Sequence, residues 1–592
     1  MGKNIEKNGL KRKSGSSFVK GALVLGVASL IVKLIGAGFK IPMTYLIDDD
    51  GMGLFNVAYQ IYTFMFIVAT AGFPAAISKM VAESLARDDE RDAKRVFQTS
   101  FSLLVVIGLV GGVILFTFAR QLANLVGMPD AELGIRAISP AVFFVSMASA
   151  LRGYFQGRQN MYPTAFSEVI ESTGKMAIGL LLASLFMGMA INPALDTIIN
   201  FGARVMQSAH MQKVYASAGA IFGVTVGTFL SAGFLICVYL FFSFSARRYA
   251  AKAAPMTAAA QKLRPKKTIL KELVAIAIPI TIGASVSSLT TLIDMTTISR
   301  RLVVNPAVFD KYEFMFREGT EFAKKALEAG WSGAELNVQK ATSLYGMYTG
   351  KALTMFNLPL TLIVALGTSI VPAISSAIAR NNKLEAKSIT ESAIRIALLF
   401  GMPCAIGMSV LSSGVLNLLF STDNAKTVLA ILSIAIIPVA VVQVTNAILQ
   451  SYGKMYYPVI NMLIGGAAKV IFNFLAIPVL GIDGAPIGTF ICYLIIAVIN
   501  TVQIIRLADI KFSFMDIIIK PLIAAAVMGV CAYFLARTLP ASRIMTLLEI
   551  MVCAVIYGIM IFVVRAVKRE DVLNLPKGEK IAGILERFKL IK

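Results

Sequence analysis

Histidine and cysteine are scarce in this sequence of 592 residues, and their scarcity limits the chemistry that it can support. The single histidine, His210, argues against a histidine metal site or proton relay. The five cysteines all fall in apolar stretches and form no CxxC pair, so we predict no disulfide framework and no cysteine metal site. Walker A, HExxH and GxSxG motifs are also missing, so we expect a protein with no catalytic residues, metal or cofactor.

Charged residues are also few, which excludes a soluble protein of this size. Hydrophobic residues make up 57% of the chain and charged residues 15%, with a mean hydropathy of +0.76. Apolar windows recur from end to end without the period-two alternation of a β-barrel. We therefore predict an all-α polytopic membrane protein with about 14 transmembrane helices. Their approximate ranges are 20–47, 54–82, 97–119, 136–157, 164–190, 217–245, 270–299, 343–377, 389–413, 426–450, 457–479, 485–507, 515–537 and 544–567.

The net charge of +23 does not predict nucleic-acid binding, because the basic residues gather in short loops between apolar windows. Basic loops such as 247–267 and 380–387 alternate with acidic ones such as Asp48-Asp49-Asp50. This pattern follows the positive-inside rule and predicts that both termini lie in the cytoplasm. A basic start precedes the first apolar run, but Lys33 and Lys40 interrupt that run, so we predict an uncleaved first helix rather than a signal peptide.

The sequence contains an internal repeat. Thr70–Ser78 resembles Gly367–Ser375, and Tyr154–Pro163 resembles Gln450–Pro458. Both copies have the same predicted orientation, which indicates two parallel, pseudo-symmetric six-helix lobes with a central cleft and alternating access by rocking. The predicted segments are a cytoplasmic basic N-terminus (1–19), an N-lobe (20–245), a cytoplasmic basic linker (246–269), a C-lobe (270–507) with an external insertion (302–340), two C-terminal helices (508–567) and a cytoplasmic basic amphipathic tail (568–592).

The insertion has apolar residues at helical spacing with charges between them. We expect a surface helix there, with a flexible loop as the alternative. A second external segment is expected over 191–216.

Two lysines inside the first predicted helix are the most informative residues. Lys33 and Lys40 are seven residues apart, so they share one helical face. A lysine near the bilayer centre costs roughly 2.5–3.5 kcal/mol on insertion scales. Two interpretations are open: a water-accessible cationic cavity, or snorkelling of each lysine to an interface. The cavity is favoured for Lys33, whereas Lys40 fits either interpretation.

Further charges lie inside other predicted helices. Glu171 and Lys175 are four residues apart, which suits an ion pair that gates the protein, binds a coupling cation or is purely structural. Asp294 could pair with a cleft lysine or take part in coupling. With Lys351, Lys469 and Arg395, the predicted buried charge is mainly positive. A cationic cleft suits an anionic substrate such as a phosphate or diphosphate head group.

Several motifs together resemble the multidrug/oligosaccharidyl-lipid/polysaccharide (MOP) flippase superfamily, in its polysaccharide-biosynthesis branch, which includes SpoVB and MurJ-type lipid II flippases. The resemblance covers nearly the whole chain. The motifs are Lys33-Leu34-Ile35-Gly36, Gly51-Met52-Gly53-Leu54-Phe55, Tyr154–Thr164 with Val169-Ile170-Glu171, Ile293-Asp294 and Val364–Pro372.

The resemblance implies a fourteen-helix, two-lobe fold that flips undecaprenyl-pyrophosphate-linked sugars from the inner to the outer leaflet of the bacterial cytoplasmic membrane. Lys33 occupies the position of a basic cavity residue of MurJ-like proteins, and Lys40 is shifted by about one residue from a second. The cavity arginine of the second helix has no counterpart in Tyr62–Phe66, and Lys351 departs from the expected eighth-helix spacing. The last two helices of such proteins border a groove for the lipid tail, and the apolar faces of 515–567 are compatible with one.

Together, these patterns and the resemblance predict a non-enzymatic flippase for lipid II or a related lipid-linked oligosaccharide. Lys33, Lys40, Lys351 and Lys469 would bind the diphosphate, and Asp294, Glu171 and Lys175 would couple or gate transport. A coupling ion or the membrane potential would reset the cycle, and membrane lipids and cell-wall synthesis proteins are the other expected partners. The alternatives are a cation-coupled MATE-like multidrug exporter, a non-transporting scaffold in cell-wall or spore-envelope assembly, and a membrane glycosyltransferase or polymerase. The exporter predicts a carboxylate-rich cleft, the scaffold predicts that Lys33→Ala keeps full function, and the glycosyltransferase needs carboxylates aligned on an external loop.

Overall fold

The computed structural model describes residues 2–87, 89–188, 209–250, 264–509, 513–540 and 542–568. These residues form helices and no strand, which confirms the predicted all-α fold. Nine helices in this part of the chain are long and apolar enough to cross a membrane, or ten if a bent pair is one span. Two of these stretches, Val24–Leu85 and Tyr456–Ala508, are 62 and 53 residues long, and one span takes about 20 residues. The total number of spans stays a prediction.

The chain divides into two compact units, each described separately below. The first unit comprises Met1–Met295 and Leu327–Gly330, and the second comprises Thr296–Ala326 and Trp331–Lys592. Much of the predicted external segment 191–216, of the linker 246–269 and of the tail 568–592 lies outside the described residues. The predicted lobe boundaries stay predictions.

Helix α1 (Gly2–Thr70) covers the basic start, the first predicted span and most of the second. Two helices merge across a kink at Asp48, whose φ of 54° and ψ of −170° are not helical. The chain breaks again at Ala71-Gly72 before α2 (Phe73–Leu85), which has Pro74 in its first turn. Proline suits that position because a first-turn N–H has no intrahelical acceptor. The second predicted span is therefore broken at this point.

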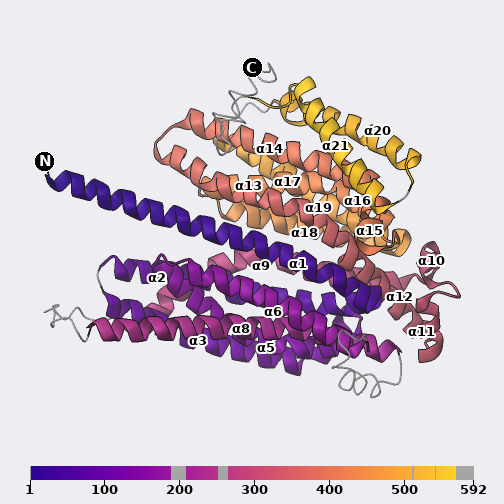
Figure 1. Ribbon diagram of the computed structural model, residues 1–592, viewed down its shortest axis with the longest axis horizontal. Coiled ribbons are helices and arrows are strands. Elements are labelled where there is room, and N and C mark those ends of the chain that lie inside the picture. The colour runs from indigo at the N-terminus through magenta and orange to yellow at the C-terminus, as the bar shows by residue number, and fades with distance from the viewer. Residues whose placement is uncertain are drawn as a thin grey trace. The chain divides into compact units, whose positions relative to one another are not determined.

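The other helices of the first unit form a closely packed group (Figure 1). A Cβ atom added to Gly223 would lie 2.5 Å from the backbone of Gly179, and one added to Gly227 would lie 2.5 Å from the carbonyl oxygen of Glu171. Gly219, Gly223 and Gly227 recur every four residues, which lets two helix backbones approach closely within a membrane. These helices are α3 (Glu90–Thr117), α4 (Ala119–Val126), η1 (Pro129–Ala131), α5 (Glu132–Gly157), α6 (Tyr162–Phe186), α8 (Ala209–Ala250) and the first part of α9 (Lys266–Val304).

The second unit is also helical, and its α14 contacts α13, α17 and α20. Its elements after α9 are η3 (Pro306–Tyr312), α10 (Glu313–Phe316), α11 (Glu321–Ala329), α12 (Gly333–Met347), the π-helical turn η4 (Tyr348–Ala352), α13 (Leu353–Ala379), α14 (Lys383–Val410), α15 (Ser412–Phe420), α16 (Lys426–Ile434), α17 (Ile436–Ser451), α18 (Tyr456–Leu480), η5 (Gly481–Asp483), α19 (Gly484–Ala508), η6 (Met515–Ile519), α20 (Lys520–Thr538) and α21 (Arg543–Val563).

The insertion is helical, as its apolar spacing predicts. Phe316 packs against Phe309 and Phe322, with ring centroids 6.2 and 4.8 Å apart. The hydroxyl of Tyr312 donates a hydrogen bond of 3.2 Å to Asp483, beyond the end of α18. Burial and the nearby Asp483 charge raise the pKa of Tyr312 well above its ordinary value, so this donor stays protonated. These contacts anchor the insertion to the end of α18.

Matching helix starts support the internal repeat. Asp89 accepts a hydrogen bond from the backbone N–H of Asp92 at the start of α3, and Asn382 accepts one from Glu385 at the start of α14. Both pairs lie in loops of similar sequence that follow the first repeated segment, Leu85–Lys94 and Ile378–Lys387. One difference separates the copies: α13 continues through the segment corresponding to the break before α2.

Candidate functional site

The two lysines of α1 lie before its kink, on the helix that packs against α6. Lys33 is exposed and Lys40 is half-buried. The hydroxyl of Ser172 on α6 donates to the carbonyl oxygen of Val32 at 3.4 Å, so α6 passes beside the Lys33 turn. Lys40 is close enough to Lys175 of α6 for the two ammonium groups to repel each other. Helices α1 and α6 therefore bring cationic groups together within the first unit.

Lys175 is held by aromatic rings. Its Nζ lies 4.2 Å from the ring centroid of Tyr59 and 5.1 Å from that of Phe39. An ammonium group over an aromatic face is attracted by the negative face of the ring. The predicted ion pair between Lys175 and Glu171 is therefore wrong, because Lys175 turns to these rings and Glu171 has another partner.

That partner is Arg152 of α5, which sequence analysis did not identify. Its guanidinium lies 2.8 Å from the Glu171 carboxylate and donates hydrogen bonds of 3.0 Å to the hydroxyls of Ser167 and Ser231. The side chains of Arg152 and Glu171 are only 9% and 21% exposed. The network joins α5, α6 and α8. Arg152 lies within the predicted span 136–157, so the rule that singled out Lys33 could also have found it.

Three of the remaining predicted charged residues lie in the second unit, and Asp294 lies in the first. Lys351 is 5% exposed in the π-helical turn η4, and its Nζ donates to the side-chain oxygen of Asn424 at 3.2 Å. π-Helical turns are frequent at functional sites. Lys469 of α18 is 6% exposed, and Arg395 of α14 is buried. Asp294 lies half-buried on α9, in the first unit. Whether these residues act on a substrate stays a prediction.

A buried network of amides in the second unit was also missed. Asn461 of α18 donates to the side-chain oxygens of Asn500 and Gln503 on α19, both at 2.7 Å. Asn500 in turn donates to Thr445 and Asn446 of α17, both at 2.9 Å. The network braces α17, α18 and α19, the predicted counterparts of α5, α6 and α8. The signal was present as amide residues inside apolar windows, which hydropathy weights less than charges.

An apolar groove of about 610 Å³ lies in the second unit between α14, α20 and α21. Its lining includes Phe400, Met408 and Met528, with Ile550, Ala554 and Ile561 on α21. A hydrocarbon chain fits such a surface because it offers few hydrogen-bonding groups. The groove lies among the helices whose apolar faces the sequence singled out.

Comparison with known proteins places the chain in a family. The sequence model of the polysaccharide biosynthesis protein family matches residues 18–308. The sequence model of the lipid II flippase MurJ family matches residues 339–553. Stage V sporulation protein B of Bacillus subtilis (strain 168) is 24% identical over 571 residues, 95% of this chain and 98% of that protein. The chain belongs to the polysaccharide-biosynthesis branch of the MOP superfamily. Lipid II flippase MurJ of the same organism is 26% identical over 536 residues, 87% of this chain and 88% of that protein.

Solved structures of MOP proteins have the same fold. The chain matches a lipid II flippase MurJ in an inward closed conformation with a TM-score of 0.63 and 13% identity, over 91% of this chain and 98% of that one. An inward-facing MATE multidrug transporter of the superfamily matches with a TM-score of 0.54 and 14% identity, over 81% and 96%. At these identities the likeness shows the fold alone. The branch is one of multi-pass membrane flippases, not of catalytic enzymes.

Proposed function

We propose that this MOP protein flips an undecaprenyl-pyrophosphate-linked cell-wall precursor, lipid II or a related lipid-linked oligosaccharide, from the inner to the outer leaflet. The observation that carries the proposal is the gathering of Lys33, Lys40 and Lys175 on α1 and α6, two largely apolar helices. None of the three forms an ion pair with another described residue, and Lys175 is held by rings instead. A diphosphate supplies the negative charge that such a group attracts.

The protein also offers a surface that suits the polyprenyl tail of the substrate. The apolar groove of α14, α20 and α21 would hold the polyprenyl tail, which needs no hydrogen bonds. Lys351 and Lys469 would be phosphate-binding residues of the second unit. The relatives support the substrate class, since one is a lipid II flippase and another a sporulation protein.

Transport would follow alternating access, with Lys175 and Asp294 as gating or coupling residues, whereas Glu171, which the sequence also suggested for that role, would stay paired with Arg152. The Arg152–Glu171 pair would serve as a fixed brace, and Lys175 would respond to the charge of the substrate. A coupling ion or the membrane potential would reset the empty protein. The protein would lie in the bacterial cytoplasmic membrane with both termini in the cytoplasm, and cell-wall synthesis proteins are its expected partners.

The test is a leaflet-access assay for lipid II in cells depleted of their own flippase. We expect the chain to restore outward exposure of lipid II, Lys33→Ala to lower it at least tenfold at equal expression, and Lys33→Arg to retain most of it. Lys79→Ala is the matched control, because the Lys79 side chain is 60% exposed and paired with Glu83. Full transport by Lys33→Ala would refute the role of Lys33, and failure of the unaltered chain to expose lipid II would refute the substrate.

The same assay separates the alternatives. A scaffold protein would restore growth without changing the exposure of lipid II. A multidrug exporter would leave lipid II in the inner leaflet and would lower the accumulation of a cationic dye in the cells.

A further inference from the structure

A second cavity, of about 840 Å³, lies in the first unit between α3, α8 and α9 and shares no residue with the candidate site. Its lining contains both polar and apolar groups. Gln98 and Ser102 of α3 and Lys266, the first residue of α9, are polar, and Leu103 and Val106 of α3 and Leu240 of α8 are apolar. The cavity thus combines a cationic group with apolar side chains.

Two apolar lining residues are exposed on a surface suited to lipid. Val106 is 57% exposed and Leu240 is 59% exposed, both on helices apolar enough to span a membrane. The lining residues of α3 run from Phe97 to Val106, a rise of about 13 Å at 1.5 Å per residue. This length admits the upper part of an acyl chain beside the helix.

The inner wall of the cavity is rigid. Phe97 packs against both Tyr154 and Tyr239 with ring centroids 4.7 Å apart in each case. Thr99, also part of the wall, is 7% exposed, and its hydroxyl has no hydrogen-bond partner among the described residues. An aromatic cluster of this kind keeps the cavity open rather than letting it collapse.

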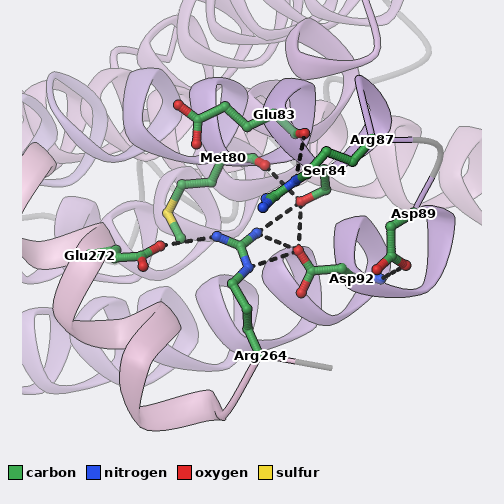
Figure 2. A network of polar contacts seen from close by, with 8 residues as sticks. All are labelled: Met80, Glu83, Ser84, Arg87, Asp89, Asp92, Arg264 and Glu272. Atoms are coloured by element: carbon green, nitrogen blue, oxygen red, sulfur yellow. Dashed lines mark hydrogen bonds and ion pairs between the residues drawn. The ribbon is translucent and has the colours of Figure 1, made fainter. Parts of the chain in front are cut away.

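A separate polar network holds the chain just before Lys266, through Arg264 (Figure 2). Arg264, two residues before it, donates to Asp92 of α3 and, at 2.8 Å, to the hydroxyl of Ser84 at the end of α2. Its guanidinium also lies 3.0 Å from the Glu272 carboxylate on α9. Hydrogen bonding to Asp92 raises the pKa of Arg264 above its ordinary value, so the charge is permanent. The network fixes the start of α9, and Lys266 with it, beside α3.

We propose that this cavity is a binding site for an anionic glycerophospholipid of the surrounding bilayer. The phosphate lies against Lys266, with Gln98 and Ser102 as hydrogen-bond partners, and an acyl chain runs along Leu103 and Val106 of α3. Charge complementarity favours an anionic lipid, because Lys266, Lys267 and Lys271 are all exposed on the first turns of α9. The apolar residues of the lining favour a lipid over a free phosphate ion.

The experiment is a lipid titration of the purified full chain in detergent, followed by native mass spectrometry. The probes are phosphatidylglycerol and phosphatidylcholine with identical acyl chains. We expect Lys266→Ala to weaken phosphatidylglycerol binding about fivefold and to leave phosphatidylcholine binding unchanged. Lys267→Ala is the matched control, since it removes the same charge one residue away from the cavity lining and should change binding less than twofold. Ser102→Phe, at an exposed lining position, should weaken both lipids.

Three results would overturn the proposal. Equal losses in the Lys266 and Lys267 variants would mean a diffuse electrostatic attraction rather than a site. Equal binding of the two lipids would remove the role of the anionic head group. Displacement of phosphatidylglycerol by lipid II, with Lys266→Ala weakening both, would assign the cavity to the transported substrate instead. Because the cavity shares no residue with the candidate site, none of these results alters the prediction for Lys33.

Discussion

Removing either partner of the Arg152–Glu171 ion pair should destabilise the protein, but not by the same amount. Arg152 donates to Glu171 and to two serine hydroxyls, and its side chain is less exposed than that of Glu171. Glu171→Leu leaves a guanidinium that cannot lose its proton inside an apolar bundle. Arg152→Leu leaves a carboxyl group that can take up a proton and become neutral. Glu171→Leu should therefore lower the free energy of unfolding more than Arg152→Leu does.

The magnitudes follow from burial. Breaking a buried pair by removing one partner costs about 3–5 kcal/mol, and Glu171→Leu should fall in that range. Arg152→Leu should cost about 2–3 kcal/mol, because Glu171 neutralises itself and the two serines lose one hydrogen bond each. The double variant should lose less than Glu171→Leu alone, since no buried charge remains. The coupling energy then exceeds the cost of Arg152→Leu alone, so it is at least about 2 kcal/mol.

The assay is reversible unfolding of the full chain in mixed micelles, with all three variants forming a double-mutant cycle. Glu83→Ala serves as the reference, because Glu83 and Lys79 form a 3.9 Å pair with side chains 50% and 60% exposed, which should contribute less than about 1 kcal/mol. The reasoning fails if Glu171→Leu costs no more than Glu83→Ala. It also fails if Arg152→Leu proves the more damaging single change.

Two further predictions concern packing and anchoring. Gly223→Ala should lower the unfolding temperature of the purified protein far more than Gly233→Ala on the same helix, because the first methyl meets the Gly179 backbone at 2.5 Å and the second meets nothing within 4 Å. Equal shifts would contradict the close approach of α6 and α8. Arg264→Lys should cost about 1–2 kcal/mol in denaturant unfolding, since one ammonium cannot reproduce the guanidinium fork, while Arg158→Lys in a more exposed pair should cost less than about 1 kcal/mol. If Arg264→Lys leaves the free energy of unfolding unchanged, the network in Figure 2 does not anchor α9.

The helical fold was predictable because its signals are local. Apolar windows give the helices, and the aligned positions of Asp89 and Asn382 give matching helix starts. The insertion was predictable for the same reason, since apolar residues at helical spacing need a helix to gather on one face. Breaks were harder to place. Pro74 and Pro372 occupy corresponding segments, but the helix stops only before the first, because tertiary packing decides whether a proline ends a helix or continues it.

The site was less predictable because partners depend on tertiary contacts. Spacing alone made Lys175 the natural partner of Glu171, but it cannot show that Arg152 on another helix offers three donors to the same region. Lys351 was identified as a charge inside a span, whereas the π-helical turn that holds it depends on backbone bonding that hydropathy does not report. Amides such as Asn500 gave a weaker signal still.

Corresponding helices of the two repeats are held together by different polar groups, an ion pair in the first unit and amides in the second. Arg152 and Glu171 brace α5, α6 and α8, and Asn461 and Asn500 brace the predicted counterparts α17, α18 and α19. Both arrangements satisfy buried donors across three helices, so either can hold the bundle. The charged version, however, occupies Glu171 and so withholds its carboxylate from Lys175. Lys175 is then left to the ring faces of Tyr59 and Phe39. Under the proposed function, the brace of the first unit would thereby keep the lysines of α1 and α6 available for an anion.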